Sequence, residues 1–278
     1  MTNRVKLKFI GLCCLLTAFT PHLHAHDFWL EPGQFYYESA TSVPIQFKVG
    51  HNKDADNWNL TWDKVVALRS YSSTGVTDMA ASIIPRSGFM PGVAKLQKRK
   101  PGSYVIGFES YHSVSTLDAE KFNGYLEEEG LKQIQTHRRE NDLSNTPGTE
   151  IYSRKAKSIV QIGNTLSDTV TRPIGHTLEI IPLQHPASLK EDGALPVQVL
   201  FRGEPLHNAM IDAMPLGEAS HQIQTLTTDK NGNATFHFTE SGPVKLNVVW
   251  GVPVENNDRA DYETYFSSLT FTVSRTSS

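Results

Sequence analysis

The chain of 278 residues has only two cysteines, Cys13 and Cys14, and both stand within its first 25 residues. Beyond them no thiol is present to form a disulfide, bind a metal as thiolate or act as a nucleophile. The chain also lacks any apolar run of about 18 residues, the minimum for a membrane-spanning helix. We therefore expect a domain without disulfides and without membrane insertion after the N-terminal segment is removed.

Signatures of common enzyme classes are also missing. The chain contains no G-x-S-x-G, no H-E-x-x-H, no Walker loop and no G-x-G-x-x-G after a strand. An acidic run, Glu127-Glu128-Glu129, falls on a predicted helix, and such a run is typical of a solvated face rather than of paired catalytic carboxylates. We therefore expect no enzymatic activity.

The N-terminus has the layout of a cleavable secretory signal. Three basic residues within positions 4–8 precede the apolar stretch Phe9–Phe19, which is about half as long as a membrane span. Ala25 supplies the small residue required before the cut, so residues 1–25 are the expected signal peptide and His26 the expected first residue of a periplasmic protein. Removal of the signal leaves 23 basic and 29 acidic residues, a formal charge of 23 − 29 = −6. A mildly acidic chain without a basic run argues against nucleic acid as a partner.

Two other processing routes fit less well. A lipid anchor on Cys13 would need a small residue where Leu12 stands. A cut after Leu23 would leave histidine as the third residue, an arrangement that wraps copper or nickel through backbone amides, but this cut is poor signal-peptidase chemistry.

Two regions of the mature chain read as β structure. Strand-like stretches bounded by Gly and Pro turns are typical of half-buried strands; they cover 42–49, 65–71, 104–108, 178–183, 197–201, 210–214, 234–238 and 245–250. The turns between the later strands are like those of transthyretin-like and other immunoglobulin-like modules. We predict a mainly β protein of two immunoglobulin-like or transthyretin-like sandwiches, 26–116 and 177–278.

The intervening segment 117–176 is the predicted α-helical insert. The stretches 117–140 and 150–163 carry apolar residues at helical spacing, with Gly130 and Pro147-Gly148 as breaks. We read this segment as two or three helices between the sandwiches.

A terminal histidine offers unusual chemistry. After cleavage, His26 would present an α-amine and an imidazole, which can chelate one ion and both lose their protons near neutral pH at modest cost. Nitrogen ligands suit nickel, cobalt, copper and zinc. His51, at the end of the first strong strand, is the best-placed further ligand, and His112, after the strand at 104–108, is the next.

Nearby carboxylates could add oxygen ligands or orient an imidazole, although solvated loop positions explain them equally well; they are Asp27, Glu31, Asp54 and Asp56. The remaining histidines of the mature chain show no ligand spacing.

Several separated motifs, in order, resemble exported proteins assigned to the periplasmic part of nickel/cobalt transport. They are A-H-D-F-W-L-E-P at 25–32, the stretches 117–131 and 154–163, L-E-I-I-P-L at 178–183, V-L-F-R-G-E-P-L at 199–206 and the segment 260–271. The resemblance implies immunoglobulin-like domains, a role in nickel or cobalt uptake, and a terminal histidine, matched by His26; His51 matches a V-G-H found in such sequences. Val249-Trp250-Gly251 departs from the pattern where we would expect a histidine.

Three functions follow as hypotheses. The first is a periplasmic protein that binds nickel or cobalt, with copper as a third candidate, and passes the ion to a membrane transporter. The second is a non-catalytic adhesion or scaffold module that binds protein or carbohydrate. The third is a copper-dependent oxidase with a histidine brace; Trp58 and Trp62 would be its aromatic substrate surface, although core packing explains them at least as well.

Overall fold

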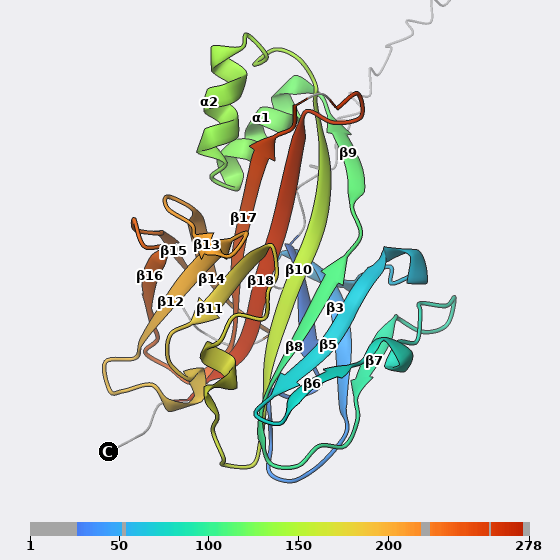
Figure 1. Ribbon diagram of the computed structural model, residues 1–278, viewed down its shortest axis with the longest axis vertical. Coiled ribbons are helices and arrows are strands. Elements are labelled where there is room, and N and C mark those ends of the chain that lie inside the picture. The colour runs from blue at the N-terminus through green and yellow to red at the C-terminus, as the bar shows by residue number, and fades with distance from the viewer. Residues whose placement is uncertain (1–26, 52–53, 218–222, 256, 275–278) are drawn as a thin grey trace, which may run out of the picture.

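The computed structural model describes residues 27–51, 54–217, 223–255 and 257–274. This part of the chain is mainly β, with three sheets and two α helices (Figure 1). The strands are β1 (Asp27–Pro32), β2 (Tyr36–Tyr37), β3 (Val43–His51), β4 (Asp54–Asn57), β5 (Val65–Ser72), β6 (Gly75–Asp78), β7 (Val93–Leu96), β8 (Gly102–Ser110), β9 (Ser113–Leu117), β10 (Gly148–Ile162), β11 (Leu178–Pro182), β12 (Ala194–Phe201), β13 (Glu204–Pro205), β14 (Met210–Pro215), β15 (Gln224–Thr227), β16 (Asn233–His237), β17 (Gly242–Pro253) and β18 (Tyr262–Val273). The α helices are α1 (Ala119–Glu128) and α2 (Lys132–Glu140), and short 3-10 turns cover Trp62–Lys64, Ala80–Ser82, Asp168–Thr171 and Pro186–Ser188.

One ten-stranded sheet runs through the molecule. Its order is β15-β14-β17-β18-β10-β8-β5-β6, with β2 and β9 also paired to β10. The pairing of β10 with β18 is parallel and joins strands from the two halves of the chain, whereas β17 and β18 are antiparallel over their full length. The long strands β10, β17 and β18 therefore form the centre of the fold (Figure 1).

Two smaller sheets cover opposite faces of this central sheet. Successive side chains of a strand point to opposite faces. On β8, Tyr104, Ile106 and Phe108 pack with the sheet of β1, β3, β4 and β7, while Val105 packs with the sheet of β11, β12, β13 and β16. The chain therefore forms β-sandwiches on the two faces of a shared sheet, in agreement with the predicted fold class.

The predicted helices are only partly confirmed. The segment 117–140 forms α1 and α2, which break at Gly130, where φ is +65°. The segment 150–163 was expected to be helical, and this prediction is wrong, because it belongs to strand β10. Its apolar residues lie on both faces of a central strand, and its buried Lys155 and Lys157 are neutralised by ion pairs, so pairing with β8 and β18 overrides the helical spacing.

The helical pair closes one end of the central sheet (Figure 1). Asp118 caps α1 by accepting a hydrogen bond from the Lys121 backbone N–H at 2.9 Å. Phe122 packs against Tyr262 of β18, and the buried Arg138 guanidinium lies over the Phe122 ring while its Nε donates to Asn123. These contacts hold the N-terminal half of α1 in a defined place above the sheet.

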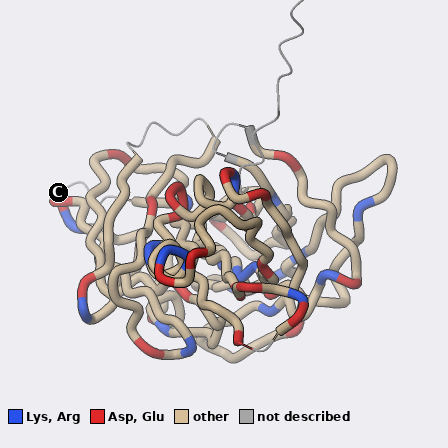
Figure 2. Tube along the Cα trace, turned by 90° about the horizontal axis from the view of Figure 1, so that it is seen from above, with Lys and Arg blue, Asp and Glu red and all other residues tan. Residues whose placement is uncertain are grey.

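The charged residues are interspersed along the trace, with no single block of one sign (Figure 2). Within the described residues, no helix is long and apolar enough to cross a membrane.

Candidate cation-binding site

The backbone brings the sequence neighbours of two predicted ligands together. Asp27 of β1 is paired with Gly50 of β3 in an antiparallel register. His26 directly precedes Asp27, and His51 directly follows Gly50. His26 itself and the side chain of His51 lie outside the described part of the structure. Opposite residues of an antiparallel pair stand about 4.5–5.5 Å apart at their Cα atoms. Asp27 and Gly50, the sequence neighbours of His26 and His51, therefore lie next to each other.

Asp27 is buried and tightly held. Its Oδ2 accepts a hydrogen bond from Lys245 Nζ at 2.6 Å, and its Oδ1 accepts one from Asn247 Nδ2 at 2.9 Å. The Lys245 ammonium also lies 4.3 Å from the centre of the Trp29 ring, a cation–π contact. Asp27 therefore fixes the start of β1 on the central sheet and neutralises a buried lysine.

Glu129, just beyond the end of α1, is only 8% exposed, while Glu127 and Glu128 are exposed. The prediction of a solvated acidic face is thus wrong for Glu129, because the helix ends here and the side chain turns toward the sheet. No described residue donates a hydrogen bond or an ion pair to its carboxylate. Burial raises the pKa of Glu129 well above its usual range, and the nearby carboxylates of Asp27, Glu128 and Asp212 raise it further.

A row of polar side chains crosses three neighbouring strands on the face that carries Asp27. Asp212 of β14 is paired with Asn247 of β17, which is paired with Ser268 of β18. Each of the three has a buried oxygen without a hydrogen-bond partner among the described residues: Oδ1 of Asp212, Oδ1 of Asn247 and Oγ of Ser268. Asn247 is 4% exposed and Ser268 1%. Most buried polar atoms of a native structure are paired. Three adjacent oxygens without partners in the described part of the chain are therefore an unusual feature of this face of the sheet.

Burial disfavours the ionised form of a second carboxyl group in this region, that of Asp212. Burial raises the pKa of Asp212, with a further increase from Asp27, while a hydrogen bond from Thr225 and the charge of Lys245 oppose the shift. The Lys245 charge is already paired with Asp27. The start of β1 therefore faces a region in which burial disfavours the ionised forms of Glu129 and Asp212.

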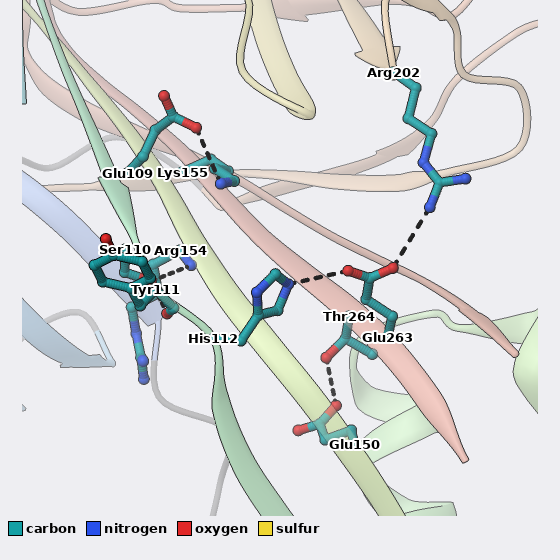
Figure 3. A network of polar contacts seen from close by, with 10 residues as sticks. All are labelled: Glu109, Ser110, Tyr111, His112, Glu150, Arg154, Lys155, Arg202, Glu263 and Thr264. Carbon is teal, nitrogen blue, oxygen red and sulfur yellow. Dashed lines mark hydrogen bonds and ion pairs between the residues drawn. The ribbon is translucent and has the colours of Figure 1, made fainter. Parts of the chain in front are cut away.

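His112 lies elsewhere on the central sheet (Figure 3). Its Nε2 is 3.0 Å from Oε1 of Glu263 on β18, and Arg202 approaches the other oxygen of the same carboxylate at 3.5 Å. Glu263 points to the opposite face from Thr264, which hydrogen-bonds Glu150 beneath the helices. The structure therefore does not bring His112 together with Asp27, and its role as a ligand stays a prediction.

A second buried polar network, which the sequence patterns did not reveal, joins two sheets. Lys157 Nζ of β10 donates to Oε1 of Glu179 on β11 at 2.7 Å, and both side chains are almost fully buried. Three consecutive backbone N–H groups, those of Ile174, Gly175 and His176, also donate to Glu179 at 2.8, 3.0 and 3.2 Å. This carboxylate is fully satisfied, so the network is a structural connection between β10 and β11.

The two tryptophans do not share a surface. Trp58 is 8% exposed and packs edge-on against Phe28 and Phe108, whereas Trp62 is 53% exposed. An open pocket of about 610 Å³ lies beside Trp58, between β4 and the segment 86–91. Trp58 is therefore chiefly a core residue.

No group of three or more His, Cys, Asp or Glu side chains that could hold a metal ion by itself is present in the part of the chain that the structure describes. A metal site here needs a ligand from outside that part, such as residue 26 or the His51 side chain. The sequence motifs alone did not point to Glu129, Asp212 or Asn247. One signal was available, since Asp212 and Asn247 are polar interruptions of the apolar stretches MIDAM and KLNVV.

Fold and site together define a mainly β protein in which β-sandwiches share one central sheet, with several carboxyl groups near the first strand. The chain belongs to the family described as domain of unknown function (DUF4198), whose profile matches residues 23–251. No curated protein matches the chain.

Solved structures with similar features include sandwich modules of several origins. The D0-D1 domain of intimin is 14% identical, with 87% of this chain and 96% of that chain covered and a TM-score of 0.23. The fibronectin(III)-like modules of Clostridium thermocellum CbhA are 8% identical, covering 88% and 94%, with a TM-score of 0.20. Murine CEACAM1b is 11% identical, covering 90% and 100%, with a TM-score of 0.19. TM-scores of this size carry no conclusion about function.

Proposed function

We propose that this protein is an exported, periplasmic binding protein for a divalent transition-metal ion, nickel or cobalt with copper as a third candidate. The ion is held by the α-amine and imidazole of His26 after signal cleavage, together with His51. The protein carries its ion to a membrane metal transporter. The single observation that carries the proposal is the pairing of Asp27 with Gly50, the sequence neighbours of these two histidines.

The charge around the start of β1 supports the same proposal. A cation next to Glu129 and Asp212 would offset the charge of carboxylates that burial disfavours. Asp27, bound to Lys245 and Asn247, positions the chain directly after His26. A ligand whose neighbour is fixed in this way loses less conformational freedom when it binds a metal.

The test is calorimetric titration of NiCl2 and CoCl2 into protein exported to the periplasm and shown by mass spectrometry to begin at His26. We expect one ion per chain at pH 7.5. The same protein made without the signal, with Met ahead of His26, lacks the terminal amine on the histidine and should bind at least tenfold more weakly.

Equal affinity of the two forms would contradict the role of the terminal amine. A mature chain that begins at another residue would contradict it as well. His207→Ala is the matched control, because His207 is exposed and belongs to another part of the surface; it should leave the affinity unchanged.

A further inference from the structure

We propose that the pocket beside Trp58 binds a neutral saccharide. The pocket has a volume of about 610 Å³ and lies between β4 and the segment 86–91. This volume falls within the range of about 300–1,000 Å³ that is usual for small-molecule sites. The inference needs no metal ion and goes beyond the proposed function.

The inner wall of the pocket is made by side chains that also belong to the core of the N-terminal sandwich. Val49 and Trp58 line the pocket, and both pack in the cluster that contains Phe28 and Phe108. The Trp58 ring stands edge-on to these two phenylalanine rings, with centroids 4.9 and 5.8 Å apart. Because core packing fixes this wall before a ligand arrives, binding costs less conformational entropy.

A tight turn forms another wall of the pocket. The backbone N–H of Arg86 donates to the Leu60 carbonyl at 3.0 Å, and that of Ser87 donates to the Met90 carbonyl at 3.0 Å. The turn presents two apolar side chains to solvent, since Phe89 is 98% exposed and Met90 57%. Both line the pocket. A ligand with an apolar face that covers the Phe89 ring therefore removes apolar surface from water.

The polar side chains of the pocket offer hydrogen-bond donors and acceptors with balanced charge. They belong to Asp56, Asn57, Asn59 and Arg86. A carboxylate accepts hydrogen bonds, a guanidinium donates them, and an amide does both. Within the described ranges of the chain, these four side chains make no hydrogen bond or ion pair with another residue. They are exposed and free to bind a ligand.

A neutral saccharide matches these features together. Each of its hydroxyl groups can both donate and accept a hydrogen bond, and the C–H groups on one face of a pyranose ring can pack flat on an aromatic ring. A purely apolar ligand would cover the polar side chains without giving them partners. An anion would meet the charge of Asp56, and a cation that of Arg86. The pairing of an exposed ring with charge-balanced polar groups therefore favours a sugar.

The experiment is a glycan array probed with the full mature chain, biotinylated and displayed on labelled streptavidin. The array holds neutral glycans built from glucose, galactose, mannose and N-acetylglucosamine, with sialylated and sulfated glycans alongside. The buffer contains EDTA, so that no transition-metal ion is bound. We expect binding to neutral glycans, and the best of them is then titrated into each variant by calorimetry.

Two variants test the lining residues. Phe89→Ala removes the exposed ring and should weaken binding about tenfold or more. Arg86→Gln removes charged donors and should weaken it by a similar factor. Tyr111→Ala is the matched control, because Tyr111 is also an exposed aromatic residue, at 57%, but does not line the pocket; we expect less than about twofold. Thermal unfolding verifies that each variant folds.

The outcomes are independent of the metal site. A wild-type chain that binds no neutral glycan overturns the inference, and so does a preference for sialylated or sulfated glycans. Wild-type affinity in both Phe89→Ala and Arg86→Gln overturns it as well. None of these results bears on nickel binding, because the measurements are made in EDTA.

Discussion

Two buried glutamates of this protein stand in opposite situations. Glu179, between the central sheet and β11, receives the Lys157 ammonium and three backbone N–H groups. Glu129, at the end of α1, receives no hydrogen bond or ion pair from the described residues, and its pKa is raised by burial and by neighbouring carboxylates. The first arrangement connects two sheets, while the second places a carboxyl group near the start of β1 where burial disfavours its ionised form.

This difference distinguishes a buried charge whose partners lie within the fold from a buried carboxyl group that lacks such partners. A buried ionic group that serves the fold has all of its partners within the fold. A buried acid without partners destabilises the empty protein, and a ligand that removes this penalty gains the corresponding free energy on binding. The two regions therefore predict opposite responses to neutralisation.

The largest effect on stability is expected at the buried network of Lys157 and Glu179. Lys157→Met leaves Glu179 buried without its cation and should lower the free energy of unfolding by about 3–5 kcal/mol, measured by urea denaturation. Lys155→Met is the matched control, because its partner Glu109 is more exposed and can turn to water; its cost should be clearly smaller. Equal costs for the two variants would show that the Lys157 network has no special structural role.

The packing of α1 over the acidic region is tested by a steric change. In Gly148→Ala, the new Cβ would stand 2.2 Å from Cδ1 of Phe122, so the ring and helix must shift, at a cost of about 1–3 kcal/mol in urea denaturation. Gly124→Ala, on the exposed side of the same helix with open space around it, should stabilise the protein by up to about 1 kcal/mol. Two changes of the same sign would contradict the described contact of α1 with β10.

Neutralising the unpartnered acid should stabilise the metal-free protein. In the presence of EDTA at pH 7, Glu129→Gln is expected to raise the free energy of unfolding by roughly 1 kcal/mol, the scale of relieving one unsatisfied buried group. The sign follows from the raised pKa: wild type loses stability as pH rises above 4.5, because the unfolded carboxyl ionises first. The matched variant Glu179→Gln should lower the stability instead. A loss of stability in Glu129→Gln would mean that the native carboxylate has a partner.

A smaller effect on stability, with the opposite dependence on pH, is expected at His185. Burial lowers the pKa of His185 to about 4 from 6.5, and its Nδ1 accepts the Ala187 N–H while its Nε2 lies 3.0 Å from Ser103 Oγ. The unfolded chain therefore binds a proton first, and stability falls as pH drops from 6.5 toward 4. Urea denaturation of His185→Asn should show a shallower fall over this interval. The exposed His207→Asn serves as control, and an identical fall in wild type and His185→Asn would contradict the assignment.

The sequence was sufficient for the strands whose alternating pattern reflects their own burial, such as β3 and β5. It failed for β10, since a strand buried on both faces has no polar side and its two lysines are neutralised by residues distant in the chain. The site was only partly predictable. His26 and His51 follow from local sequence, but Asp212, Asn247 and Ser268 become neighbours only through strand pairing.

The most direct test of the central claim is thermal unfolding of the processed protein with and without nickel. At a free ion concentration about 100 times the dissociation constant, the melting temperature of wild type should rise by roughly 5 °C or more. The Met-extended form should lose about half of this shift or more, because a tenfold weaker affinity lowers the stabilisation at the same ion concentration from about 2.7 to about 1.4 kcal/mol. A wild-type protein whose melting temperature does not respond to nickel, or a Met-extended form with an undiminished shift, would contradict the account.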